Sequence, residues 1–261
     1  MSVNATSLSS FNANHELYDK ARPSFQEDAV KWLIDTAGLH KGSKVVELAV
    51  GTGKFTKAIV DNGYELVAVE PSEGMLVSFK KNFPQIEAKI GSSYETGIES
   101  QWADAVIVAQ AYHWFADHKS LEELHRILKP GGKLVFVWNI EVLDGLSETH
   151  WQKVTTEKVW AYDVNVPQYR HDKWQDSFKN QPWFKIPYQE KILPYQLTYA
   201  QDDMWGYWES RSYITALDDA EKAQLKEFID GVVSKALKEE RDSENKLVAE
   251  RGTHVVVATS I

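Results

Sequence analysis

The chain of 261 residues is predicted to fold as an α/β domain around a doubly wound, mostly parallel sheet of seven strands. Three observations predict this fold. Short apolar runs alternate with helix-like stretches over the first half of the chain, a Gly-Thr-Gly turn follows the first run, and a Lys-Pro-Gly-Gly turn precedes the fifth. In such a sheet the strand-to-helix loops meet along one edge, and ligands bind there.

The first half supplies five strands and the helices between them. The β-branched run 44–50 (KVVELAV) predicts a buried parallel strand, and the segment 54–63 after it predicts a helix that stops at Gly63. A second helix is expected to begin at Pro71-Ser72, and a third is expected through 121–128. Further strands are expected at 65–69, 86–90, 103–109 and 133–138.

The pattern changes after Asn139. The stretch 144–180 is rich in Trp, Lys and Glu and is expected to be helical, while 185–199 alternates like a strand despite two prolines. Helices are then expected at 202–213 and 218–237, and a last strand at 253–259.

A single domain spanning 1–261 accounts for this order. Within it we expect an N-terminal lid (1–30), a ligand-binding core (31–140), a helical cap inserted after the fifth strand (141–215), and a final helix and strand (216–261).

Composition excludes several classes of function. The chain has 29 Lys and Arg against 38 Asp and Glu, a net charge of -9, which disfavours nucleic acid as the main partner because phosphate binding needs cations. It has no cysteine, and its histidines show no metal-ligand spacing, so no metal is expected. No apolar run is long enough to cross a bilayer and no signal peptide is evident, so a cytoplasmic protein acting on a small molecule is expected. The oligomeric state is left open.

The most informative segment runs from Val45 to Glu70. Gly51 and Gly53 allow a tight turn that brings backbone N–H groups and a helix N-terminus to a ligand. Glu70 ends the next strand, where a carboxylate can accept both hydroxyls of a ribose. Gly-x-Gly alone could serve only the geometry of a strand-to-helix turn, but strand, turn, helix and acid together favour a nucleotide site.

At these residues the chain resembles the class I S-adenosylmethionine-dependent methyltransferases, with a type-11 domain. Val45 to Gly53 is similar to their motif I, Glu70-Pro-Ser to motif II, and Lys129-Pro-Gly-Gly-Lys to the turn before their fifth strand. The stretch 105–115 (AVIVAQAYHWF) and the N-terminal segment Tyr18-Asp-Lys-Ala-Arg22-Pro-Ser resemble the trans-aconitate methyltransferase-like, small-molecule branch. The resemblance covers about residues 10 to 140 and implies the Rossmann-like methyltransferase fold.

The resemblance implies S-adenosylmethionine as cofactor and a role for each matching residue. The methionine part would lie among Glu47, Ala49, Gly51 and Gly53, and its carboxylate would contact Tyr18 and Arg22. The ribose would bind Glu70, and Ser72 and Met75 would flank the ribose and the adenine. The adenine edge would contact Ser92, Ser93 and Tyr94, and the sulfonium would lie beside Gln110 and Ala111. One position departs from the pattern, because Ala49 stands where the family has its first glycine. Cofactor binding is expected to survive this change.

Two alternative functions are also compatible with the sequence. An NAD-type oxidoreductase could use a similar fold, although its third small residue would be expected where Thr56 stands. A cofactor-binding protein without catalysis is the other rival, and the Ala49 departure keeps it open.

The acceptor is expected to be a small metabolite methylated on a carboxylate or hydroxyl oxygen. His113 is the candidate general base; alternatively His113 and Trp114 only floor the acceptor pocket, and a carboxylate acceptor would need no base. Trp208 and Arg211 share a helix face and could form an aromatic wall and a cation for an acidic group. They could equally be cap core and a surface ion pair.

Overall fold

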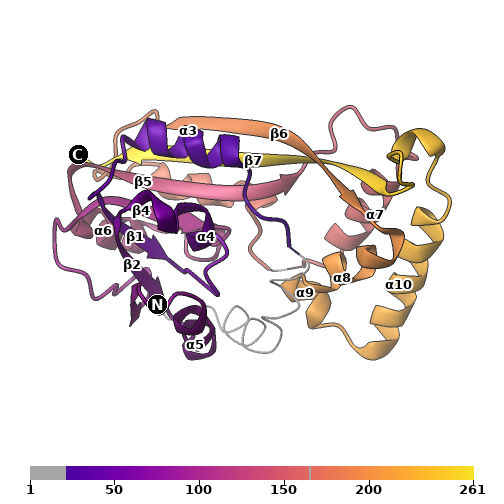
Figure 1. Cartoon of the computed structure of the whole chain (residues 1–261), viewed down its shortest axis with the longest axis horizontal. Helices are drawn as coiled ribbons and strands as arrows, with labels where there is room; N and C mark the ends of the chain where they lie inside the picture. Colours follow the sequence, from indigo (N-terminus) through magenta and orange to yellow (C-terminus); the bar gives the residue numbers. More distant parts are fainter. Residues whose placement is uncertain (1–21, 165) are drawn as a thin grey trace.

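The computed structural model describes residues 22–164 and 166–261. Its centre is a seven-stranded sheet with the strand order β3-β2-β1-β4-β5-β7-β6. The first five strands pair in parallel, whereas β7 runs antiparallel to both β5 and β6. The predicted doubly wound, mostly parallel sheet is therefore confirmed (Figure 1). The strands are β1 (Lys44–Leu48), β2 (Glu65–Glu70), β3 (Glu87–Ile90), β4 (Ala103–Ala109), β5 (Leu128–Glu141), β6 (Gln189–Tyr199) and β7 (Leu247–Thr259).

Helices cover both faces of the parallel half. Leu33 of α3 packs with the odd-numbered residues of β4 and β5, and Phe79 of α5 packs on Ala68 of β2 on the same side of the sheet. Leu124 of α6 lies on the opposite face with Phe136. The helices are α3 (Glu27–Ala37), α4 (Thr56–Ile59), α5 (Glu73–Asn82), α6 (His118–Ile127), α7 (Trp151–Trp160), α8 (Met204–Glu209), α9 (Ser212–Thr215) and α10 (Asp219–Val233).

A second group of helices surrounds the far ends of β6 and β7. Trp151 of α7, Trp208 of α8 and Ile229 of α10 share one buried apolar cluster with Leu247 of β7. Two stretches of chain on either side of β6 supply these helices, which gather at one end of the long strands (Figure 1). The division of the chain into lid, core, cap and final segment remains a prediction. None of the helices in 22–164 and 166–261 combines the length and apolar character that a membrane span requires.

The structure differs from the predicted elements where turns compete with helix. The expected helix at 54–63 is the single turn α4 followed by a 3-10 turn, although it stops at Gly63 as predicted. Among the described residues of the stretch 144–180, α7 is followed only by short 3-10 turns, because Asp172 takes a left-handed φ of 55° and Phe178 is buried against the sheet. The helix expected at 202–213 is broken at Arg211, whose backbone is extended.

Candidate active site

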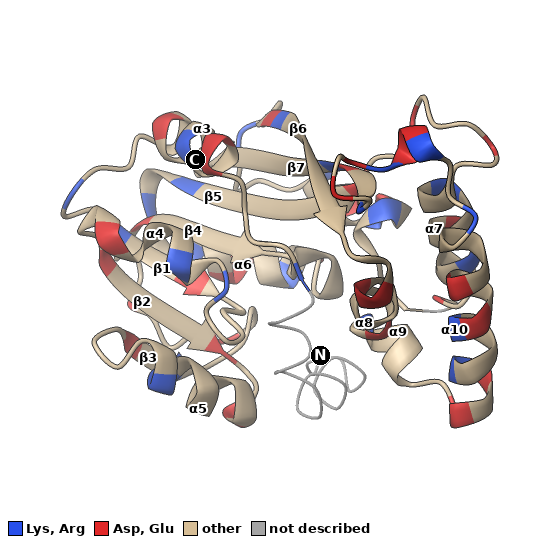
Figure 2. Cartoon of the chain, turned by 45° about the vertical axis from the view of Figure 1, so that its right-hand side comes forward, with Lys and Arg blue, Asp and Glu red and all other residues tan. Residues whose placement is uncertain are grey.

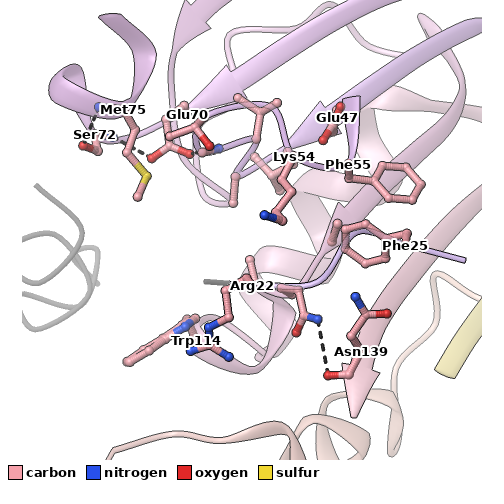
Figure 3. A pocket seen from close by; sticks show the side chains of 18 of the residues that line it. Arg22, Phe25, Glu47, Lys54, Phe55, Glu70, Ser72, Met75, Trp114 and Asn139 are labelled. Atoms are coloured by element: carbon pink, nitrogen blue, oxygen red, sulfur yellow. Dashed lines mark hydrogen bonds between the residues drawn. The ribbon is translucent and has the colours of Figure 1, made fainter. Parts of the chain in front are cut away.

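A large pocket opens at the carboxyl ends of the parallel strands. It has an empty volume of about 1420 Å³, which includes its open mouth, and is roomy enough for a nucleotide-sized ligand beside a second small molecule. Figure 3 shows side chains converging on it from opposite walls, with Glu70 and Met75 on one side and Arg22 and Trp114 on the other. The pocket therefore lies where the sequence places the ligand.

Glu70 is held in a fixed orientation at the tip of β2. One carboxylate oxygen accepts a hydrogen bond from the Gly51 N–H at 2.9 Å and the other accepts from the Ser72 N–H, also at 2.9 Å. The Ser72 side chain caps α5 by accepting from the Met75 N–H at 3.3 Å. Burial raises the pKa of Glu70, and the two N–H groups oppose that rise. The turn and the acid thus form one preorganised unit.

Glu47 lies on the floor of the pocket at the end of β1. It is 1% exposed and accepts a hydrogen bond of 2.6 Å from the Thr56 hydroxyl. Burial raises the pKa of this carboxyl to about 8, despite the opposing effect of Thr56. Burial thus favours the protonated form of Glu47, and a cation placed beside it would favour its ionised form.

The backbone of the turn after β1 is left-handed at three residues. Ala49, Gly51 and Gly53 have φ values of 56°, 59° and 92°. A Cβ on Gly53 would lie 2.3 Å from the ring of Phe83, so this glycine is required by packing. Gly53 does not line the pocket, whereas Ala49 and Gly51 do.

The end of β4 forms the middle of the pocket wall. Gln110 has a left-handed φ of 60°, and its side-chain amide donates to the Asn139 backbone carbonyl at 3.3 Å. The Asn139 side chain in turn donates to the Ser24 carbonyl at 3.2 Å, which holds the segment entering α3 over the pocket. Tyr94 stands on the loop after β3 and donates to Asp117 at 2.9 Å; burial and that carboxylate raise its pKa to about 12.

The side of the pocket next to α8, β6 and β7 carries cations and phenols. Arg22 lies against α8, where its Nε donates to the Ser210 hydroxyl at 2.8 Å. Tyr195 of β6, Tyr207 of α8 and Arg251 of β7 also line the pocket. The two ends of the pocket therefore differ in chemistry: hydrogen-bonding turns lie at the tips of β1 and β2, and aromatic and cationic groups lie next to α8, β6 and β7.

Most of the predicted cofactor residues converge on this pocket. Its lining includes Arg22, Glu47, Ala49, Gly51, Glu70, Ser72, Met75, Ser92, Ser93, Tyr94, Gln110 and Ala111, as well as Trp114 from the predicted acceptor residues. Tyr18 lies outside the described residues. Trp208 is buried in the helical cluster at 1% exposure, and Arg211 pairs with Glu141 beneath the pocket wall. Neither of these two contributes to the lining.

His113 does not line the main pocket; it lines a second cavity together with Trp114 and Phe115, which line both. Its Nδ1 accepts a hydrogen bond from the Trp138 indole N–H at 3.3 Å. Protein atoms crowd the imidazole, and this burial, reinforced by the nearby His171, Arg211 and Arg170, lowers its pKa to about 3. His113 is therefore a neutral side chain at physiological pH.

Several lining residues were missed from the sequence. Phe25 and Phe55 meet edge to face with ring centroids 5.0 Å apart, and the Lys54 side chain extends between Glu70 and Arg22 toward the middle of the pocket (Figure 3). Lys54 could have been found, because it directly follows Gly53. Tyr207 and Arg251 could not be placed from local patterns, since they reach the pocket only through the packing of α8 and the antiparallel pairing of β7.

Comparison with known proteins agrees with this geometry. A methyltransferase domain model matches residues 46–136. The chain is 28% identical over 226 residues to an uncharacterized methyltransferase-like protein of Schizosaccharomyces pombe, with 86% of each chain covered. It is 38% identical over 130 residues to an uncharacterized methyltransferase of Mycobacterium tuberculosis, covering 50% of this chain and 52% of that relative.

Solved structures share the fold. The YcgJ protein of Bacillus subtilis matches with a TM-score of 0.58 at 15% identity, covering 90% of this chain and 98% of that one. Because the domain match, the relatives and the fold agree with the strand-tip pocket, the chain is an S-adenosylmethionine-dependent methyltransferase.

Proposed function

We propose that the enzyme transfers the methyl group of S-adenosylmethionine to a carboxylate or hydroxyl oxygen of a small molecule within this pocket. The observation that carries the proposal is the difference in chemistry between the two ends of the pocket. The Glu70 end offers oriented acceptors and backbone turns, and the cap end offers Arg22, Tyr195, Tyr207 and Arg251. A donor and a separate acceptor can lie side by side between them.

The residues at the strand tips fit the cofactor. Both Glu70 oxygens are already oriented by backbone N–H groups and keep lone pairs for the two ribose hydroxyls. Met75 and Tyr94 offer apolar surface on the adenine side, and Glu47 would pair with the methionine ammonium. Arg22 and Lys54 supply positive charge for the methionine carboxylate.

When bound, S-adenosylmethionine would supply an electrophilic methyl group: an acceptor oxygen would attack the methyl carbon in line as the carbon–sulfur bond breaks, and S-adenosylhomocysteine would be the leaving group. The protein's contribution to such a displacement is positioning and the exclusion of water. Gln110 and Ala111 would lie beside the sulfonium. Phe25, Phe55 and Trp114 would close the pocket around it.

We propose that His113 acts on the acceptor only through its neighbour Trp114, which lines the pocket, rather than by removing a proton. A group with a pKa of about 3 is a weak base at neutral pH, and His113 does not line the main pocket, whereas its neighbours Trp114 and Phe115 do. A carboxylate acceptor needs no base, because it is already ionised.

A small molecule fits better than a nucleic acid. The net charge is -9, and Lys and Arg are interspersed with Asp and Glu along α10 (Figure 2). A polyphosphate would instead need a continuous cationic surface.

Transfer of a radiolabelled methyl group from S-adenosylmethionine tests the proposal. The purified enzyme is given a panel of small carboxylic acids and hydroxylated compounds, with small amines and RNA as comparison acceptors. We expect label on an acid or hydroxyl compound and a strong loss of transfer in Glu70→Ala. Label confined to amines or RNA, or no transfer with any acceptor despite cofactor binding, would refute it.

A further inference from the structure

A polar residue, Asn139, follows the buried apolar run 134–138 of β5. Asparagine is depleted in strands, so its presence at this position calls for a structural reason. Asn139 and Phe25 both line the pocket (Figure 3). The side-chain amide of Asn139 and its backbone carbonyl each make hydrogen bonds to neighbouring segments of the chain, and these bonds supply the reason.

The side-chain amide of Asn139 has a defined orientation. Its Oδ1 accepts a hydrogen bond of 2.8 Å from the hydroxyl of Thr253, a buried residue directly opposite on β7. On the other side its Nδ2 donates to the Ser24 carbonyl at 3.2 Å and to the Pro23 carbonyl at 3.5 Å. The reverse orientation would set Oδ1 against these two carbonyl oxygens, neither of which can donate, so the network admits only one.

These bonds hold the segment 22–26, which we call the strap, against the end of β5. The strap carries two side chains that line the pocket, Arg22 and Phe25. The Arg22 Nε donates to the Ser210 hydroxyl of α8 at 2.8 Å, and the Phe25 ring meets the ring of Phe55 edge to face. The strap thus has three points of attachment, and the amide on β5 provides the middle one.

The backbone carbonyl of Asn139 holds a second part of the pocket wall. It accepts a hydrogen bond of 3.3 Å from the side-chain amide of Gln110, directly after β4. Gln110 has a left-handed φ of 60°, and its N–H donates to the Val137 carbonyl at 2.8 Å. A residue other than glycine keeps such a conformation only where its surroundings enforce it. Asn139 therefore connects the strap with the turn that ends β4.

We propose that Asn139 is a positioning residue for the cofactor. Through its amide it holds the strap, with Arg22 and Phe25, against the pocket, and through its carbonyl it holds Gln110. Detachment of the strap from β5 would widen the pocket and let the cofactor leave, so the amide slows cofactor dissociation. This role depends on the cofactor and not on the acceptor, and it therefore goes beyond the proposed function.

The affinity for S-adenosylhomocysteine and its rate of dissociation test the proposal. Asn139→Leu keeps the backbone carbonyl and a side chain of similar size but loses the amide. It is expected to bind S-adenosylhomocysteine roughly 3- to 10-fold more weakly, mostly through faster dissociation, which is the effect of one lost hydrogen bond. Thr253→Val removes the hydroxyl that orients the amide and should give a smaller loss, whereas Thr253→Ser keeps the hydroxyl and should bind as the wild type does.

Two comparisons separate positioning from a general loss of stability. Gln152 is a buried amide that donates to the carbonyls of Val142 and Glu250, away from the pocket, so Gln152→Met is the matched control. It should lower the Tm, as Asn139→Leu does, and leave the affinity for S-adenosylhomocysteine unchanged. In a double-mutant cycle with Phe25→Ala, the two losses of affinity should sum to less than their separate values, because Asn139 acts through the strap that carries Phe25.

Unchanged affinity in Asn139→Leu, an equal loss in Gln152→Met, or additive losses in the cycle would overturn the role of Asn139 and leave the proposed function intact. If Asn139→Leu does not fold, the two Thr253 variants decide, and equal affinity in Thr253→Val and Thr253→Ser would overturn it. Absence of methyl transfer to any acid or hydroxyl compound would count against the proposed function alone. Failure of S-adenosylhomocysteine to bind the wild type would overturn both.

Discussion

Replacing Ala49 by glycine should stabilise the protein. Ala49 has a φ of 56°, in the left-handed region, and its N–H is tied to the Val69 carbonyl by a 2.7 Å hydrogen bond, so the turn cannot relax. An L-residue in this conformation costs about 1–2 kcal/mol. Glycine also makes the unfolded chain more flexible, and this lowers the free energy of unfolding by about 0.4–1 kcal/mol. The difference is a net stabilisation of about 1 kcal/mol.

Thermal unfolding measures this gain. For a chain of this size about 1 kcal/mol corresponds to a rise in Tm of about 2–4 °C. The matched control is Ala58→Gly, an exposed residue of the short helix α4, where the same substitution should cost about 1 kcal/mol. Affinity for S-adenosylhomocysteine should not fall in Ala49→Gly, since only a methyl group leaves the pocket wall. A loss of stability in Ala49→Gly equal to that in Ala58→Gly would refute the reasoning.

Three further predictions concern the pocket and the turn. Because burial raises the pKa of Glu47 from 4.5 to about 8, the folded state holds a proton that the unfolded state releases, so the free energy of unfolding should fall as pH rises through that window. Urea unfolding of Glu47→Gln should show a weaker fall, and superimposable profiles would show that Glu47 holds no such proton. His113→Gln should change the KM for the acceptor, through the neighbouring Trp114, and keep the shape of the pH–rate curve around neutrality; loss of the acidic limb, where a general base becomes protonated, would identify His113 as the base after all. Gly53→Ala should lower the stability by about 1–3 kcal/mol through its clash with Phe83, with partial recovery in Gly53→Ala/Phe83→Leu, whereas an unchanged Tm would contradict the packing of the turn.

Local patterns were sufficient for the parallel half of the fold. The strands β1, β2 and β4 are short β-branched or apolar runs buried on both faces, and such runs have few alternatives to a central parallel strand. The contact between Glu70 and the Gly51 turn also follows from strand order alone, because adjacent parallel strands end at the same edge. These features depend on neighbours close in sequence.

The rest depends on tertiary packing. Helix α3 was not predicted, although Ala29, Val30, Leu33 and Ala37 are buried at helical spacing and Gly38 ends it in a left-handed conformation. The acidic and polar residues around them weakened that pattern. Arg251 was also missed, because its strand was expected to begin only at Thr253 and its partner Glu141 is far away in sequence. A charged residue within an otherwise apolar strand was the available signal.

The direct test of the account is a calorimetric titration of S-adenosylhomocysteine into the wild-type protein and into Glu70→Ala. We predict a single binding site in the wild type, no response to NAD, and an affinity roughly 10- to 100-fold lower in the variant, since the carboxylate that bonds the ribose is gone. Equal affinity in the two proteins, or NAD binding in place of S-adenosylhomocysteine, would contradict the assignment of the strand-tip pocket.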